Sequence, residues 1–381
     1  MALLDFPSTV QAVVTVAIIY ALYRIYWELT VGASRRALIK EQGCKPVKSN
    51  SELNSFPQDI IGLKALQKMI QANKRHKLLE LWKDQYVRNG NTTYQKLLFT
   101  SIIATIEPEN LKTIMALNFK SWGLSTRRQD AALPLLGAGI FTTNGAAWQH
   151  SRELLRPNFV RSQVGDLDTF EIHVDQLLKA IPRDGSTVDL QDLFFQLTMD
   201  TATEFLFGQS TNCLTQGVKD EANLKFAVAF NRAQNEVARS FQRGTTNKFF
   251  RSKQFKADTQ YLNEFVDRFV QKGLGYRERL NSEKTDPREG ERYVFLYEIC
   301  KQTNDAVKIR SELINILLAG GDTTASLLSD VFFVLARRPD IWGKLRTEVD
   351  ALGGERPTFQ QLKDMKYLRM ILNESVYPVS L

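Results

Sequence analysis

Cysteine and histidine are scarce in this sequence. Three cysteines occur among 381 residues, they lie far apart, and no two of them form a CxxC pair. The three histidines show no spacing typical of metal ligands: His76, His150 and His173. A disulfide framework and a structural zinc site are therefore not expected, and the pattern is typical of a reduced protein that faces the cytosol.

The chain also lacks internal repeats, low-complexity tracts and any break in composition. Hydrophobic residues make up 43% and charged residues 24%, which is ordinary for a globular protein and excludes a disordered or multi-span membrane protein. The net charge of +8 suits an anionic membrane surface, an acidic protein partner or nucleic acid. Because the basic residues are dispersed and no nucleic-acid-binding signature occurs, we expect no nucleic-acid partner.

One stretch near the N-terminus carries no charge. Residues 6–23, FPSTVQAVVTVAIIYALY, are 18 uncharged residues, enough to span a bilayer, and aromatic residues follow at the expected interface. Asp5 precedes the run, whereas basic residues follow it: Arg24, Arg35, Arg36, Lys40, Lys45 and Lys48. This bias predicts a single-pass anchor over residues 1–30, in the lipid bilayer, with the body in the cytosol. The alternative is a cleaved signal peptide, but a basic start and a good cleavage site are missing.

The body is expected to be mainly helical with a small β-sheet, an α+β fold. Residues 31–60 are interpreted as a linker and the start of this body, which then occupies residues 61–381. The segment 91–108, NTTYQKLLFTSIIATIEP, is rich in Thr, Ile and Leu and predicts two short strands. Further on, STVDLQDLFFQLTMDTATEFLFG predicts an amphipathic helix capped near Ser186 and ended by Gly208.

Residues 314–335, INILLAGGDTTASLLSDVFFVL, form an apolar helix whose middle is polar. A second membrane span is disfavoured, because Asp322 and Asp330 would each cost about 2.5–3.5 kcal/mol near the centre. A plain core helix is also a poor explanation, since each glycine costs about 0.5–1 kcal/mol relative to alanine. The segment therefore suggests a functional site.

The chemistry of that site follows from the side chains. Thr323 and Thr324 can donate to the carbonyls four residues earlier and so bend or widen the helix. The two glycines let a flat ligand or a diatomic molecule approach the bare backbone. Asp322 and Thr323, an acid beside an alcohol, could pass protons from water to a bound oxygen species.

Two motifs carry a resemblance to a known family. AGGDTT resembles the oxygen-binding motif of the central helix in cytochrome P450 monooxygenases, and WQHSRELLRPNF resembles the helix that holds a haem propionate there. RRPDIWGKLRTEVDAL and YLRMILNE resemble the helices that follow the central one. VDLQDLFFQLTMDTATEFLFG and IEPEN look most like the fungal microsomal branch that hydroxylates n-alkanes and fatty acids.

The resemblance implies a cytochrome P450 fold and a haem-dependent monooxygenase. One oxygen atom from O2 would enter a small hydrophobic, aliphatic substrate, with electrons from NADPH through a cytochrome reductase at the endoplasmic reticulum membrane. Asp322 and Thr323 would be the catalytic, proton-delivering residues. Four residues would contact the cofactor: Trp148, Arg152, Ala319 and Gly320.

Near its end the sequence departs from the family pattern. The family has Glu-x-x-Arg where this chain has Glu374, and Tyr377 stands at the position of the arginine. No glycine-rich loop with an axial cysteine occurs, since the three cysteines lie in other contexts: Cys44, Cys213 and Cys300. We therefore expect residues 61–381 to be a partial cytochrome P450 domain, truncated, without a metal ligand and catalytically incomplete. The alternative is a non-catalytic membrane-anchored protein or a pseudogene product.

Overall fold

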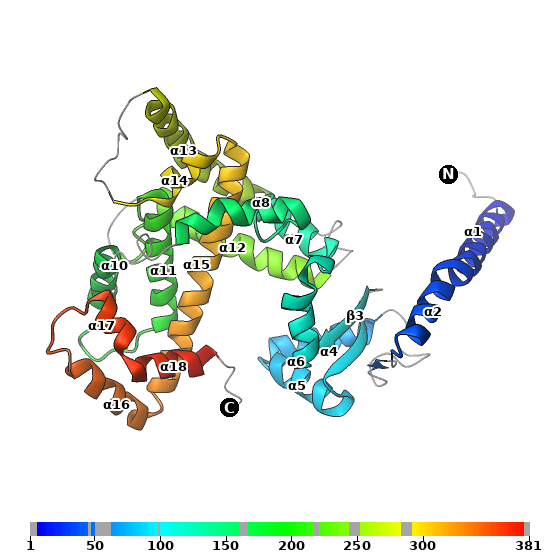
Figure 1. The fold of residues 1–381 in the computed structure, drawn as a ribbon, viewed down its shortest axis with the longest axis horizontal. Helices are drawn as coiled ribbons and strands as arrows, with labels where there is room; N and C mark the ends of the chain where they lie inside the picture. Colours follow the sequence, from blue (N-terminus) through cyan, green and yellow to red (C-terminus); the bar gives the residue numbers. More distant parts are fainter. Residues whose placement is uncertain are drawn as a thin grey trace. The chain divides into compact units, whose positions relative to one another are not determined.

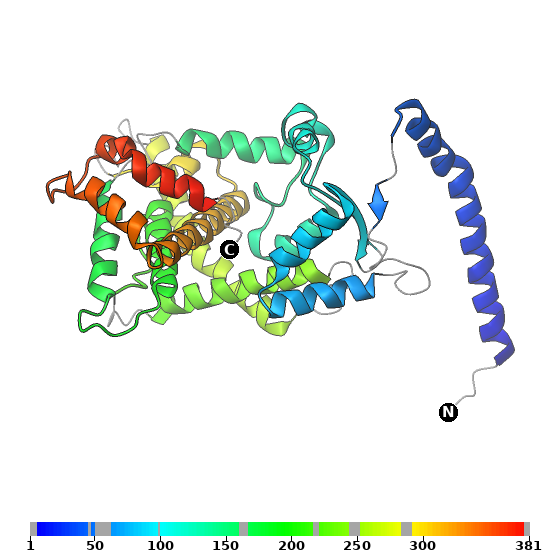
Figure 2. The ribbon, with the colours of Figure 1, turned by 90° about the horizontal axis from the view of Figure 1, so that it is seen from below.

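The computed structural model describes residues 6–44, 47–49, 62–97, 100–159, 167–215, 221–243, 252–282 and 292–376. The chain divides into two compact units, residues 1–119 and residues 120–381. Helices dominate both, and the first unit also holds a small sheet (Figures 1 and 2). A mainly helical fold with a small sheet agrees with the expectation from the sequence.

The N-terminal helix is longer than the predicted anchor. Helix α1 (Phe6–Trp27) continues through the π-helical turn η1 (Glu28–Gly32) into α2 (Ala33–Glu41), so regular structure reaches into the range interpreted as a linker. Charged pairs bridge the junction, because Glu28 contacts Arg24 at 3.2 Å and Arg36 at 2.7 Å. Residues 11–41 are apolar and long enough to cross a membrane, and their most apolar window is entirely unburied. Length and composition alone fit an anchor or a signal sequence.

The sheet forms where the sequence predicted it. Strands β2 (Thr92–Leu97) and β3 (Thr100–Thr105) are antiparallel, with Thr92 opposite Thr105, and β1 (Lys48–Ser49) adds to β2 in parallel. The two strands expected within residues 91–108 are thus confirmed. Helix α6 (Pro108–Lys112), which starts with a proline, follows the sheet. The other short elements of this unit are α4 (Leu63–Lys74), α5 (Leu78–Asn89) and η2 (Thr113–Leu117).

The second unit is built from helices around one long central helix, α15 (Ala306–Leu335), drawn in orange in Figure 1. Its remaining elements begin with η3 (Phe119–Ser121), whose first residue belongs to the first unit. They continue with α7 (Thr126–Leu136), α8 (Gly145–Leu155), η4 (Arg156–Phe159), α10 (Leu167–Ala180), α11 (Leu190–Phe207), α12 (Glu221–Arg243), α13 (Lys253–Ser282), α14 (Phe295–Gln302), α16 (Pro339–Asp350), α17 (Phe359–Asp364) and α18 (Lys366–Val376).

Helix α15 lies inside the main core and packs most extensively against α11. Leu313 and Leu317 are fully buried, and they share a core cluster with aromatic residues of α12, α13 and α14. By length and hydropathy α15 would also qualify as a membrane span. Its first half, residues 309–317, is mostly buried in the core cluster, which together with the two aspartates argues for a core helix of this unit.

Helix α11 ends as predicted but begins later. Gly208 terminates it in the left-handed conformation, with φ of 71°. The cap expected near Ser186 is wrong, because Asp189 is the N-cap and its carboxylate accepts from the amides of Gln191 and Asp192. The ionised Asp189 carboxylate accepts from two backbone amides of the first turn and is a stronger acceptor than the Ser186 hydroxyl, which lies three residues earlier.

Candidate functional site

The segment 319–324 lies in the middle of α15. Residues 306–335 are α-helical throughout, so the widening expected from the two threonines is not observed. The Thr323 hydroxyl donates to the Ala319 carbonyl at 2.7 Å, as its spacing predicted. Packing does not require the glycines, since a Cβ on Gly320 would meet only Ala202, at 3.7 Å, and one on Gly321 would meet nothing within 4 Å. The exposed Gly320 thus leaves bare helix surface near the acid and the alcohol, whereas Gly321 is buried.

Asp322 differs from its neighbour in exposure. The aspartate is half-buried, whereas Thr323 is exposed. Burial raises the pKa of the Asp322 carboxyl, and the Gln234 side chain of α12 partly opposes this rise. A carboxyl group with a raised pKa next to a hydroxyl is suited to taking up and releasing protons.

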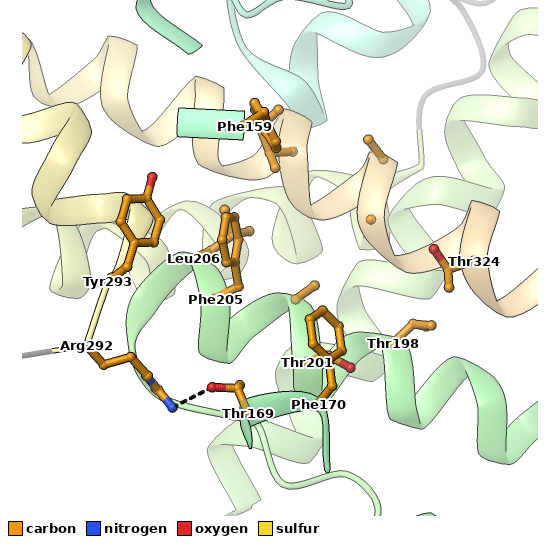
Figure 3. Close-up of a pocket in the computed structure, with 14 residues that line it drawn as sticks. Phe159, Thr169, Phe170, Thr198, Thr201, Phe205, Leu206, Arg292, Tyr293 and Thr324 are labelled. Carbon is orange, nitrogen blue, oxygen red and sulfur yellow. Dashed lines mark hydrogen bonds between the residues drawn. The ribbon is translucent and has the colours of Figure 1, made fainter. Parts of the chain in front are cut away.

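A cavity of about 380 Å³ borders the same segment (Figure 3). Aromatic rings and aliphatic groups form most of its wall, and the threonine hydroxyls that α11 contributes are bonded to carbonyls of that helix. The cavity therefore suits an apolar molecule. Its lining residues are Ile316, Ala319, Gly320 and Thr324 of α15, Thr198, Thr201, Ala202, Phe205 and Leu206 of α11, Thr169 and Phe170 of α10, and Phe159, Arg292 and Tyr293.

A charged cluster borders this cavity through Arg292 and Thr169. Arg292 donates to the Thr169 hydroxyl at 3.0 Å, the bond drawn in Figure 3, and to the Glu204 carboxylate at 2.7 Å. The buried His173 lies 3.2 Å from the other Glu204 oxygen. This His173 hydrogen bond, together with Arg292, lowers the pKa of Glu204 to about 2 against the effect of burial. Burial lowers the pKa of His173, but Glu204 and the Asp200 charge outweigh it and raise that pKa. The charges of Arg292, Glu204 and His173 thus compensate one another within the cluster.

The predicted anion-binding pair lies on α8. The Arg152 guanidinium stands 5.5 Å from the centre of the Trp148 ring, so these residues share one face of the helix as their spacing predicted. Arg152 is exposed, and within the described ranges it forms no ion pair. An exposed arginine that is oriented by an aromatic ring suits a carboxylate ligand.

Three polar side chains of α15 fix the loop before α8, and the sequence analysis missed them. We call Lys308, Glu312 and Asn315 the polar stripe. Glu312 accepts from the Ile140 amide at 3.2 Å. Asn315 accepts from the Phe141 amide at 3.0 Å and donates to the Leu136 carbonyl at 2.8 Å. Their recurrence at intervals of four and three residues on an apolar helix was the signal available in the sequence.

Lys308 connects this stripe directly to α8. Its ammonium group donates to the Ser151 hydroxyl at 2.6 Å and lies 2.8 Å from Glu312 Oε1. That oxygen has no well-aligned hydrogen bond within the described residues, so the Lys308 charge is what compensates it. A Cβ on Gly139 would collide with the Asn315 amide, which explains the glycine in the loop. The helix that carries Arg152 is therefore held against the helix that carries Asp322.

None of the three cysteines lines the cavity. Cys44 is exposed after α2, in the first unit. Burial raises the pKa of Cys213 and that of Cys300 to about 12, so both thiols are protonated at neutral pH. Glu374 is exposed on α18, and Tyr377 lies outside the described residues.

Comparisons with known proteins agree on one family. The cytochrome P450 family model matches residues 57–377, which is most of the chain. Cytochrome P450 monooxygenase himC of Aspergillus japonicus is 42% identical over 345 residues, which are 88% of this chain and 60% of that protein.

Two further relatives are also cytochromes P450 by name. Cytochrome P450 monooxygenase fsdH of Fusarium heterosporum is 36% identical over 376 residues, 96% of this chain and 65% of that protein. Cytochrome P450 52A5 of Candida maltosa is 43% identical over 308 residues, 75% of this chain and 57% of that protein. The chain thus spans about three fifths of the length of the curated relatives that it matches.

Proposed function

Because the chain belongs to the cytochrome P450 family, we propose that it supplies the substrate and proton-delivery side of a haem-dependent monooxygenase. The substrate would be aliphatic, such as an n-alkane or a fatty acid. One observation carries the proposal: Gly320, Asp322 and Thr323 lie together on α15, and the helix borders an apolar cavity at Gly320.

The residues present fit part of the cofactor that the family implies. Haem is a flat ring with two carboxylate side groups, and its iron is the oxidising centre when it is bound. The bare backbone at the exposed Gly320 leaves space for such a ring, and the exposed Arg152 suits one of its carboxylates. Cys213 and Cys300 do not fit the place of the metal ligand, because they lie outside the cavity lining and burial raises their pKa values, and the exposed Cys44 lies in the first unit. We therefore assign no metal ligand in this chain.

The side chains on α15 would handle protons. Asp322 carries a carboxyl group whose pKa is raised by burial, and such a group is suited to taking up and releasing a proton. Thr323 keeps its hydroxyl bonded to the Ala319 carbonyl, which fixes the position of its oxygen lone pairs. The hydroxyl can then accept a further hydrogen bond while it remains a donor to its own helix. The cavity suits an apolar substrate because most of its lining cannot form hydrogen bonds.

The protein is proposed to reside in the endoplasmic reticulum membrane, with residues 6–23 as its anchor and electrons supplied by an NADPH-dependent reductase. The long N-terminal helix supports this location. Protease added to sealed microsomes is expected to digest the body and to leave a short membrane-protected fragment. A variant without residues 1–30 should leave the membrane fraction. Protection of most of the chain without detergent would reverse the proposed orientation.

A non-catalytic membrane-anchored protein is the second candidate, and the positions of the thiols favour it. The 381-residue protein, supplied with haem, reduced and exposed to carbon monoxide, is expected to give no stoichiometric thiolate-type absorption band. The reason is that Cys300 is buried and Cys213 partly buried, and this raises the pKa of both thiols so that they stay protonated. A full thiolate-type band would contradict this expectation. Loss of that band in one of the three single Cys→Ala variants would then identify the recruited residue.

A further inference from the structure

One face of helix α10 carries a buried histidine. Thr169, His173 and Leu177 follow one another at intervals of four residues, so they share one side of the helix, and all three are buried. Leu177 packs in an apolar cluster that includes Phe194 of α11. Thr169 and His173 instead form polar contacts, and Thr169 and Phe170 line the cavity. The part of α10 that borders the cavity is therefore attached through polar groups.

The imidazole of His173 faces an oxygen atom from each of its ring nitrogens. Nε2 lies 3.2 Å from a Glu204 carboxylate oxygen, and Nδ1 lies 3.4 Å from the side-chain oxygen of Gln176. Because a carboxylate and an amide oxygen both accept hydrogen bonds, both ring nitrogens have to donate. The imidazolium cation is the form of histidine that has two N–H donors. The geometry therefore fits a charged His173 in the folded protein.

Further charged groups surround this contact. Glu204 accepts from the Arg292 guanidinium at 2.7 Å, and Arg292 also donates to the Thr169 hydroxyl (Figure 3). Asp200 of α11 adds a second negative charge that acts on the imidazole, and its oxygens are held by the loop that follows α11. With His173 protonated, these two cations and two carboxylates balance. Loss of the imidazolium charge leaves one negative charge in excess.

The other side of α10 carries ion pairs of its own. Arg356 lies 2.6 Å from the Glu171 carboxylate and 3.1 Å from that of Asp175. Residues two positions from His173 on a helix point away from its side, so these carboxylates do not face the imidazole. They would hold α10 at any pH at which carboxylates are ionised.

We propose that His173 is a pH-dependent latch: doubly protonated, it ties the start of α10 to α11 through Glu204, and loss of one proton weakens this tie at the edge of the cavity. The latch requires neither haem nor oxygenase chemistry, so it goes beyond the proposed function and does not depend on it.

The direction of the pH dependence follows from the two pKa shifts. Burial lowers the pKa of His173, but the bonds to Glu204 and Gln176 and the Asp200 charge outweigh it and raise that pKa above 6.5. The stabilisation is therefore complete below the ordinary value of 6.5 and is lost as the pH rises through the raised value. The pKa of Glu204 is lowered to about 2, so this carboxylate stays ionised throughout. Higher pH thus loosens α10.

Hydrogen exchange of the α10 amides tests the latch in the 381-residue protein. Exchange is measured by mass spectrometry at about pH 5.5 and about pH 8.5, and each rate is divided by the intrinsic rate at that pH. At the higher pH, residues 167–180 are expected to open about tenfold more often, because the bond to Glu204 loses its charge assistance from the imidazole. Peptides from α13 provide the internal reference, since the residues of the cluster lie on other elements.

Two substitutions separate the latch from simple packing. His173→Gln keeps a neutral donor without the charge, so opening of α10 should be frequent at both pH values. Glu204→Gln should also abolish the pH dependence, which supplies a second test if the first variant folds poorly. His150→Gln is the matched control, since it removes an exposed histidine of the same unit, and it should keep the dependence of the unaltered protein. Exchange that is independent of pH in the unaltered protein, or equally dependent on pH in His173→Gln, overturns the proposal.

Discussion

Replacing Glu312 with leucine is expected to lower the free energy of unfolding of the 381-residue protein by about 3–5 kcal/mol. Glu312 is fully buried, and its carboxylate both compensates the Lys308 ammonium and accepts from the Ile140 amide. The leucine would leave a largely buried positive charge and an unpaired amide. Urea denaturation followed by circular dichroism measures the change.

The double variant Lys308→Met/Glu312→Leu separates charge from packing. Because it removes both members of the pair, it should recover a large part of the lost stability. Asp350→Ala is the matched control, since it breaks an exposed pair with Arg346 at the same i,i+4 spacing. It should cost no more than about 0.5 kcal/mol. A loss for Glu312→Leu no larger than this control would show that the polar stripe contributes little to the fold.

Replacing Thr323 with alanine is expected to divert reducing equivalents from product into hydrogen peroxide while haem binding is retained. The measurement requires a complete enzyme, for example a chimera of residues 1–376 with the C-terminal region of the Aspergillus japonicus relative. Positioned proton donors contribute about 10²–10⁴-fold to a rate, so product formed per NADPH should fall steeply. Asp322→Asn should lower turnover more than substrate affinity, because the amide cannot release a proton.

Ser329→Ala is the control for both substitutions. Ser329 also lies on α15, and its hydroxyl donates to the carbonyl four residues earlier at 2.7 Å, as the Thr323 hydroxyl does. It lies outside the 319–324 segment, whose Ala319, Gly320 and Thr324 border the cavity. This variant should keep the ratio of product to NADPH. If all three variants formed the same amount of product per NADPH, the 319–324 segment would contribute only to packing.

The sequence predicted those parts of the fold that local rules determine. The two strands follow from a run rich in Thr and Ile, and Gly208 ends α11 because glycine readily adopts a positive φ. The start of the same helix was misplaced, since Ser186 and Asp189 are both good capping residues and only the folded loop selects one. The helix over residues 33–41 was also missed. Its polar side chains form pairs such as Arg36 with Glu28, which are visible only in the folded helix.

For the candidate site, the sequence supplied individual residues without their neighbours. The Thr323 bond and the Trp148–Arg152 contact follow from i,i+4 spacing, which any helix imposes. The influence of the Gln234 side chain on the pKa of Asp322 joins positions far apart in the chain, and no periodicity within one helix indicates it. The same holds for the polar stripe, whose partners are backbone groups of a distant loop. Backbone groups carry no sequence signal.

Because the chain is synthesised from its N-terminus, the polar stripe is made well after the loop to which it bonds. Its bonds to the loop join residues 172 to 179 positions apart. At about 5–20 residues per second, a ribosome would need roughly 10–35 s to pass from the loop to the stripe. Throughout this interval the loop amides have only water to bond with, and α8 can form without its final attachment. Arg152 of α8 and Asp322 of α15 can therefore take their final relative positions only after α15 has been made. Translation of α15 sets the earliest time at which α8 and α15 can pack together.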